Sequence, residues 1–286
     1  MNTCCPQSGA LYYLLMVFLL GLPQTLEAGP EDLTPAAPLV AMLEQSDGWA
    51  PLFDGRSLQG WEGNLEGYRA EDGALVCTVK GGNLYTTQSF SDFALAFQFK
   101  LSPGANNGLG IRTPREGNPA YAGMELQILD DDAPRYSGLE PWQFHGSIYG
   151  VVPTAQGHLR PAGEWNTQYV ICAGPHVLVI LNGTTIIDAD LREVEPVDGK
   201  EHPGLAREDG RLAFCGHGAR VEFKDLRVRD FAADAAPASD GEQPPRGFTP
   251  LFNGRDLEGW QGLVSNPKAR RDMAPEQLAE AQAMAD

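Results

Sequence analysis

Short runs in which apolar and other side chains alternate fill most of the chain after Ala70. In Phe93–Phe99 every second residue is large and apolar, and Asn182-Gly183 separates two runs rich in β-branched residues. Alternation with period two is typical of half-buried strands, and an Asn-Gly pair is a strong hairpin signal. No convincing amphipathic helix pattern appears before Leu257. The sequence therefore predicts an all-β domain, a jelly-roll β-sandwich of two antiparallel sheets.

One motif occurs twice. APLFDGRSLQGW at Ala50–Trp61 returns as TPLFNGRDLEGW at Thr249–Trp260, a separation that fits a domain rather than a solenoid repeat. Residues 232–247, rich in Ala and Pro, indicate a linker. We therefore expect one complete domain over residues 48–231. Residues 248–286 are expected to be the truncated start of a second copy, ending in a short helical C-terminal tail.

The N-terminal region carries an apolar run from Ala10 to Leu22. Its length suits the core of a signal peptide better than a membrane span. We predict a signal peptide over residues 1–28 and a linker over residues 29–47. The predicted location is secreted or periplasmic, with no membrane attachment after signal removal. The formal net charge of −17 disfavours nucleic acid and anionic membranes as partners.

The cysteines of the predicted domain are Cys77, Cys172 and Cys215, and they are far apart with no CxxC spacing. That spacing does not indicate a metal site. We interpret all three as small core residues. The alternative is a single disulfide with one thiol left over.

The stretch GMELQILDDD at Gly123–Asp132 is the clearest candidate for a functional strand. Its apolar residues fall on one face, and Glu125 and Gln127 fall together on the other. Asp130 marks the expected end of the strand. From the residues alone, this polar face is either a working site or the solvated side of an ordinary strand.

Several blocks occur in an order that resembles a known family. They are PLFDGRSLQGW, DFALAFQFKLSPGANNGLGIR, GMELQILDD, HGSIYGVVP, PAGEWNTQYVICAGPHVLVILNG and GRLAFCGHGARVEFKDLRVRD. This arrangement resembles the domain long called DUF1080, now the 3-keto-disaccharide hydrolase domain. The resemblance implies a concanavalin-like lectin or glucanase fold in an exported bacterial protein. It also implies cleavage of a glycosidic bond in a sugar oxidised at C3.

A ketone at C3 changes what an active site must supply. It acidifies the proton on C2, so that a base removes it, the bond at C1 breaks by elimination, and water adds back. Such a site needs a base, a stabiliser of the enediolate and an acid for the leaving oxygen. An ordinary glycosidase needs two carboxylates across the bond instead, and the sequence leaves that open.

The predicted catalytic residues match motifs of the family. Glu125 and Asp130 lie in its E-x-Q-I-L-D block, and His217 lies in its HG pair. We predict Glu125 as the base or as a metal ligand, and His217 as an acid–base group because histidine titrates near neutral pH. Asp130 is expected to bind a cation or hold a histidine. The metal is unassigned, although Ca²⁺ suits acid-rich oxygen ligands.

The predicted substrate contacts are polar or aromatic residues near these motifs. Amides and guanidinium groups bond sugar hydroxyls, and aromatic faces pack on sugar C–H groups. The predicted contacts are Arg112, Gln127, Asn107, Tyr149, His145, Trp142 and Asn166.

Two functions stay open from the sequence. The first is an enzyme that acts on a 3-keto glycoside or oligosaccharide. The second is a carbohydrate-binding module of the same fold, in which the polar residues form hydrogen bonds with sugar hydroxyls but catalyse no reaction. Convergence of Glu125, Asp130, Arg112 and His217 in one groove would favour catalysis.

Overall fold

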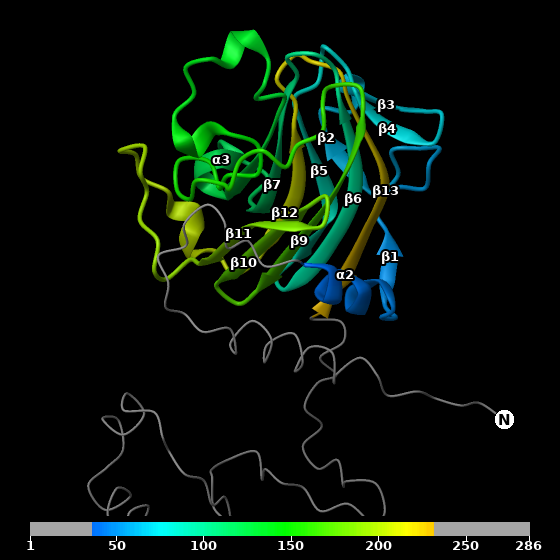
Figure 1. Cartoon of the computed structure of the whole chain (residues 1–286). Helices are drawn as coiled ribbons and strands as arrows, with labels where there is room; N and C mark the ends of the chain where they lie inside the picture. Colours follow the sequence, from blue (N-terminus) through cyan, green and yellow to red (C-terminus); the bar gives the residue numbers. More distant parts are fainter. Residues whose placement is uncertain (1–35, 232–286) are drawn as a thin grey trace, which may run out of the picture. The chain divides into compact units, whose positions relative to one another are not determined.

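The computed structural model describes residues 36–231. Within the described residues, two antiparallel sheets pack into a sandwich (Figure 1), which confirms the predicted all-β class. The predicted signal peptide, the linker at 232–247 and the second copy with its helical tail lie outside the described residues.

The larger sheet has eight strands, all paired antiparallel. Asn182 and Gly183 have positive φ angles and form the turn between the strands His176–Leu181 and Thr184–Asp190, as the hairpin signal predicts. In spatial order the strands are β11 (Thr184–Asp190), β10 (His176–Leu181), β9 (Trp165–Ala173), β6 (Phe93–Leu101), β13 (Val221–Asp230), β4 (Ala74–Cys77) and β3 (Tyr68–Glu71), with β1 (Trp49–Pro51) paired to β13.

The smaller sheet has five strands and carries the polar face that the sequence singled out. Its order is β2 (Trp61–Gly63), β5 (Asn83–Phe90), β12 (Gly210–Cys215), β7 (Asn106–Thr113) and β8 (Met124–Leu129). In the segment GSIYGVV, Ile148 forms isolated bridges with Leu126 and Val152. Tyr149 N donates to Glu125 O at 2.8 Å. The segment therefore runs along β8 and places Tyr149 beside Glu125.

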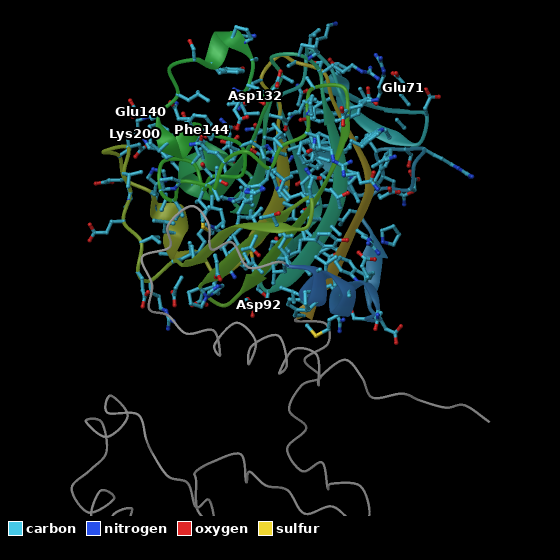
Figure 2. The ribbon with its side chains drawn as sticks, viewed as in Figure 1. Glu71, Asp92, Asp132, Glu140, Phe144 and Lys200 are labelled. Atoms are coloured by element: carbon cyan, nitrogen blue, oxygen red, sulfur yellow. The ribbon has the colours of Figure 1, made fainter. Side chains whose placement is uncertain are left out.

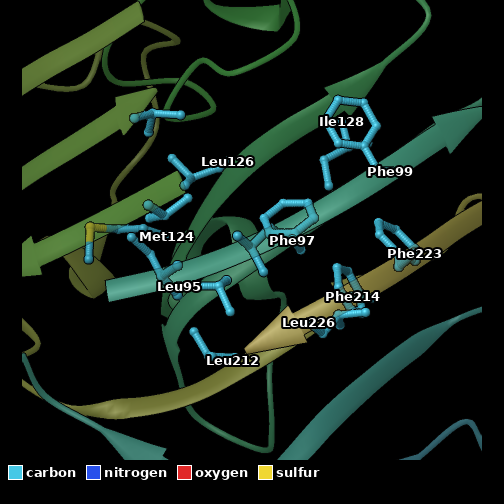
Figure 3. Close-up of a cluster of buried hydrophobic side chains, with 14 of the residues drawn as sticks. Leu95, Phe97, Phe99, Met124, Leu126, Ile128, Leu212, Phe214, Phe223 and Leu226 are labelled. Carbon is cyan, nitrogen blue, oxygen red and sulfur yellow. The ribbon is translucent and has the colours of Figure 1, made fainter. Parts of the chain in front are cut away.

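The inner faces of the two sheets meet in a core rich in aromatic rings (Figure 3). Phe214 stacks on Phe223 with ring centroids 3.9 Å apart, and Trp61 stacks on Phe214 at 5.7 Å. Burial of each such side chain stabilises the fold by about 1.5–3 kcal/mol. From β8, Met124, Leu126 and Ile128 point into this core. Because strand side chains alternate, Glu125 and Gln127 must face outward.

A helix corrects the prediction that residues 29–47 form only a linker and that no helix precedes Leu257. Helix α2 (Ala37–Glu44) buries Leu39 and Leu43 in a cluster with small and aliphatic residues on the outer face of β6, β9 and β10. Eight residues are too few for a helical period to stand out in a sequence. The other helices are α3 (Pro119–Ala122), η1 (Leu65–Gly67), η2 (Pro134–Tyr136), η3 (Pro141–Gln143) and η4 (Pro203–Ala206).

In the part of the chain that the structure describes, no helix is long and apolar enough to cross a membrane. Cys77, Cys172 and Cys215 are all buried and carry free thiols, in agreement with the prediction of small core residues rather than a disulfide. Burial raises the pKa of each thiol, that of Cys172 to about 12. These thiols are therefore protonated at neutral pH.

Candidate active site

A pocket of about 250 Å³ opens over the outward faces of β7 and β8. Glu125 and Gln127 enter it from β8, and His217 enters from the turn after β12. Further walls come from the segments before and after β8. Its polar lining includes Asn106, Tyr121, Glu125, Gln127, Tyr149 and His217.

A carboxylate and an imidazole meet in this pocket. Oε1 of Glu125 lies 3.7 Å from Nε2 of His217. The Glu125 side chain is only 8% exposed, and its Oε1 has no hydrogen-bond partner, whereas the His217 side chain is half exposed. The adjacent Glu125 carboxylate raises the pKa of His217 above its ordinary value of 6.5, against the opposing effect of burial. The pair therefore combines a buried base with a protonatable group at the solvent edge.

The charge of Glu125 should be visible in the titration of His217. We expect Glu125→Gln to lower the pKa of His217 toward 6.5, because the substitution removes the negative charge that favours the imidazolium form. An NMR titration of the His217 ring measures this shift. The matched control is Glu66→Gln, at an exposed position, which should leave the His217 titration unchanged. An unaltered His217 pKa in Glu125→Gln would show that the two groups do not interact.

A glycine on β7 makes room for the Glu125 carboxylate. A Cβ atom built on Gly108 would lie 1.7 Å from Glu125 Oε1, so the Glu125 side chain crosses directly over this backbone. The strand register places Gly108 opposite Gln127 and Gly110 opposite Glu125. Gly108 therefore leaves the space that the Glu125 carboxylate occupies, whereas at Gly110 the corresponding space is taken by Thr113.

We expect Gly108→Ala to reduce turnover by about 10²-fold, because the new methyl group displaces the carboxylate by an ångström or more. Stability should change little, since the group in the way is the end of a side chain. Steady-state kinetics with a thermal melt measures both. Gly138→Ala is the matched control, because nothing lies within 4 Å of a Cβ there. Full activity in Gly108→Ala would mean that the position of the carboxylate is unimportant.

Tyr149 forms part of one wall of the pocket, and Trp142 packs against it. Trp142 packs edge-to-face on Tyr149, with ring centroids 4.9 Å apart and planes at 87°. Nε2 of Gln143 donates to the Tyr149 hydroxyl at 3.4 Å. The structure thus brings Tyr149 to the pocket and places Trp142 behind it. The loop residue Glu140 lies on the same side of the molecule as α3 in the view of Figure 2.

Two residues predicted on β7 do not face the pocket. Asn107 is fully buried and lies on the core side of β7 with Leu109, so Asn106 reaches the pocket in its place. Arg112 is also buried, and its guanidinium donates to the carbonyl oxygens of Ser91 and Gly174 and pairs with Asp92. The φ angle of Arg112 is +49°, so simple strand alternation does not hold at this end of β7.

His145 and Asn166 have structural partners. Nδ1 of His145 accepts a hydrogen bond from Leu129 N at 3.3 Å, which leaves Nε2–H to donate to Gln168 Oε1 at 3.1 Å. Burial lowers the pKa of His145 to about 4, so the ring is neutral at neutral pH. Oδ1 of Asn166 accepts from Arg160 N at 2.8 Å. Neither residue lines the pocket of Glu125 and His217.

Asp130 lies outside the pocket of Glu125 and His217 and borders a different one. Its N–H donates to Ala105 O, and its Oδ2 accepts from Gly104 N at 2.6 Å, so the carboxylate fixes the turn before β7. It borders a separate recess of about 470 Å³ with Pro103 and Arg135. In residues 36–231 no group of three or more His, Cys, Asp or Glu side chains is placed to hold a metal ion. The divalent cation considered from the sequence therefore has no assigned ligands.

Asn106 and Tyr121 are pocket residues that the sequence analysis missed. Strand alternation could have identified Asn106, because every second residue of a strand faces the same side and Asn106 therefore shares the outward face of β7 with Gly108 and Gly110. Tyr121 lies in the short helix α3, where no periodic pattern marks it.

A two-sheet sandwich whose polar pocket holds a carboxylate beside an imidazole has the groups of a carbohydrate-active enzyme. Residues 48–229 match the family described as 3-keto-α-glucoside-1,2-lyase-like domains, and the chain belongs to this family. The family expected from the sequence blocks is therefore confirmed.

The relatives agree with this assignment. A 3-keto-disaccharide hydrolase of Bacteroides thetaiotaomicron is 24% identical over 228 residues, which cover 64% of this chain and 79% of the relative. A crystal structure from Parabacteroides distasonis, provisionally assigned as a glycosyl hydrolase, is 28% identical with a TM-score of 0.58, covering 64% of this chain and 98% of its own. A second crystal structure from that organism has the same provisional assignment and is 25% identical with a TM-score of 0.55. The match covers 66% of this chain and 96% of the other.

Proposed function

We propose that this protein cleaves the glycosidic bond of a 3-keto disaccharide or related 3-keto glycoside by abstraction of the C2 proton, elimination and hydration. The observation that carries the proposal is the buried Oε1 of Glu125, without a hydrogen-bond partner and 3.7 Å from Nε2 of His217. The name of the Bacteroides relative, 3-keto-disaccharide hydrolase, supports the substrate class.

Glu125 is the base. Its Oε1 lies in the pocket without a hydrogen-bond partner, so its lone pairs are free to accept the C2 proton of a bound substrate. The C3 ketone makes the C2–H bond acidic, and the electrons of that bond form the enediolate as the proton moves to Oε1. Gln127 and Asn106 line the same pocket, where their carboxamides bond substrate hydroxyls.

His217 stabilises the charge that forms on the C3 oxygen. Its raised pKa favours the imidazolium form, which donates a hydrogen bond to this oxygen as it becomes negative. A single well-placed donor of this kind is worth about 10²–10³-fold in rate. The enediolate then re-forms the ketone, a C1=C2 double bond appears, and the C1–O bond breaks. The carboxyl proton on Glu125 then exchanges with water in the pocket, and water adds at C1 as Glu125 delivers a proton to C2.

The proposal is tested with a pair of substrates that differ only at C3. The 3-keto disaccharide should be cleaved, whereas the parent disaccharide with a C3 hydroxyl should not, because its C2 proton is not acidic. Product formation by liquid chromatography measures both reactions. Equal cleavage of the two would indicate an ordinary glycosidase instead. Saturable binding without cleavage of either would indicate a carbohydrate-binding module.

We also propose that the protein acts outside the cytoplasm. The apolar run Ala10–Leu22, followed by small residues, supports this location. Fractionation of cells that produce the full chain, with N-terminal sequencing of the product, tests it. A product that starts near Gly29 is expected, and an uncleaved product in the cytoplasm would contradict the proposal.

A further inference from the structure

Tyr121 lines the pocket with Glu125 and has a cationic partner. Nζ of Lys200 lies 2.6 Å from the Tyr121 hydroxyl and 4.9 Å from the centre of its ring. We propose that Tyr121, assisted by Lys200, is the acid that donates a proton to the leaving oxygen. This inference rests on the proposed function, which requires such an acid and leaves it unnamed.

A buried pair of side chains, His202 and Asp198, supports the Tyr121 ring. This ring packs on the His202 ring with centroids 4.8 Å apart, and Nε2 of His202 lies 3.1 Å from Oδ1 of Asp198. The side chains of His202 and Asp198 are 2% and 1% exposed. This support fixes the direction in which the Tyr121 hydroxyl points, which a proton donor requires.

The same support is joined to the wall that carries Tyr149. The N–H groups of Val197 and Asp198 both donate to Gly150 O. A Cβ on Gly150 would lie 2.7 Å from Asp198 Oδ2 and 2.8 Å from His202 Cε1, so the chain there passes closely against the pair. Tyr121 and Tyr149 are therefore positioned by one packed unit beside Glu125. In the view of Figure 2, Lys200 lies on the same side of the molecule as Glu140.

Among the pocket tyrosines, Tyr121 is the one whose hydroxyl accepts a hydrogen bond from an ammonium group. The Tyr136 hydroxyl donates to Gly104 O at 3.3 Å, and that of Tyr149 accepts from Gln143. An adjacent positive charge stabilises the phenolate that remains after proton transfer. The Tyr121 hydroxyl in turn raises the pKa of Lys200, so the ammonium group stays charged.

The proton balance of the full reaction closes with these groups. The Tyr121 proton moves to the leaving oxygen as the C1–O bond breaks, and the phenolate pairs with Lys200. The water that adds at C1 gives one proton to this phenolate, and Glu125 delivers a solvent-exchanged proton to C2. The resting protonation states are then restored, and no oxidant or further reactant is required.

Tyr121→Phe, which keeps the ring and its His202 contact, tests the acid role with two leaving groups. The leaving group of a 3-keto disaccharide is its second sugar, which departs as a basic alkoxide. The leaving group of a nitrophenyl 3-keto glycoside is nitrophenolate, which is stable without a proton. We expect the variant to slow the disaccharide by about 10²–10⁴-fold and the nitrophenyl glycoside by less than about tenfold. Equal slowing of both would overturn the acid role. A wild-type protein that cleaves neither substrate would overturn the proposed function itself.

Lys200→Met tests the role of the ammonium group. The variant should show the same selective loss on the disaccharide, smaller in size, with an unchanged melting temperature because Lys200 is exposed. Lys80→Met, at another exposed lysine, is the matched control and should cleave both substrates like the wild type. Wild-type rates on both substrates in Lys200→Met would overturn the assistance by Lys200.

Discussion

Glu125→Gln is expected to lower kcat/KM for a 3-keto disaccharide by about 10²–10⁴-fold, the usual contribution of a general base. The amide has almost the same size as the carboxylate but does not accept the C2 proton. The pocket should stay intact, because the carboxylate has no hydrogen-bond partner at Oε1 that the amide would lose. Steady-state kinetics measures the loss, and a thermal melt shows that the fold is retained.

The matched control is Glu66→Gln, at an exposed position on η1, which should keep wild-type activity. Retained turnover in Glu125→Gln, with the expected fold, would remove Glu125 from the role of base. The recess that holds Asp130 would then be the next place to look for a carboxylate.

Arg112→Met is expected to destabilise the protein by about 3–5 kcal/mol. The Arg112 side chain is 3% exposed, and it bonds the carbonyl oxygens of Ser91, Gly174 and Arg207 as well as pairing with Asp92. Its removal takes away the guanidinium that donates to these part-buried acceptors, and it breaks the ion pair of the buried Arg112 side chain. Denaturant unfolding measures the change in the free energy of unfolding.

Arg69→Met is the matched control, because the Arg69 side chain is 57% exposed and pairs with Glu71 at the surface. It should cost less than about 1 kcal/mol. If Arg112→Met were as stable as this control but bound sugar poorly, the original prediction of Arg112 as a substrate contact would be restored.

Strand alternation explains most of what the sequence predicted correctly. Period two places Met124, Leu126 and Ile128 in the core and Glu125 on the outward face, which the structure shows directly. The family motif added His217, which lies close enough to Glu125 to form an ion pair. These signals are local, so a single sequence contains them.

The errors come from places where local rules do not apply. Asn107 was assigned without regard to its parity with Leu109, and the positive φ of Arg112 breaks the alternation. His145 lies in a loop that folds back onto Gln168, a contact that no sequence period encodes. Tyr121 and Lys200 are 79 positions apart and meet only in the folded chain.

The origin of the hydrogen at C2 of the product tests the central claim most directly. The 3-keto disaccharide is incubated with the protein in D₂O, the reaction is stopped early, and deuterium in the released 3-keto sugar is located by NMR and mass spectrometry. Abstraction by Glu125 followed by hydration predicts deuterium at C2, well above an enzyme-free control. Cleavage with the original hydrogen fully retained at C2 would contradict the account, because direct displacement at C1 leaves that bond intact.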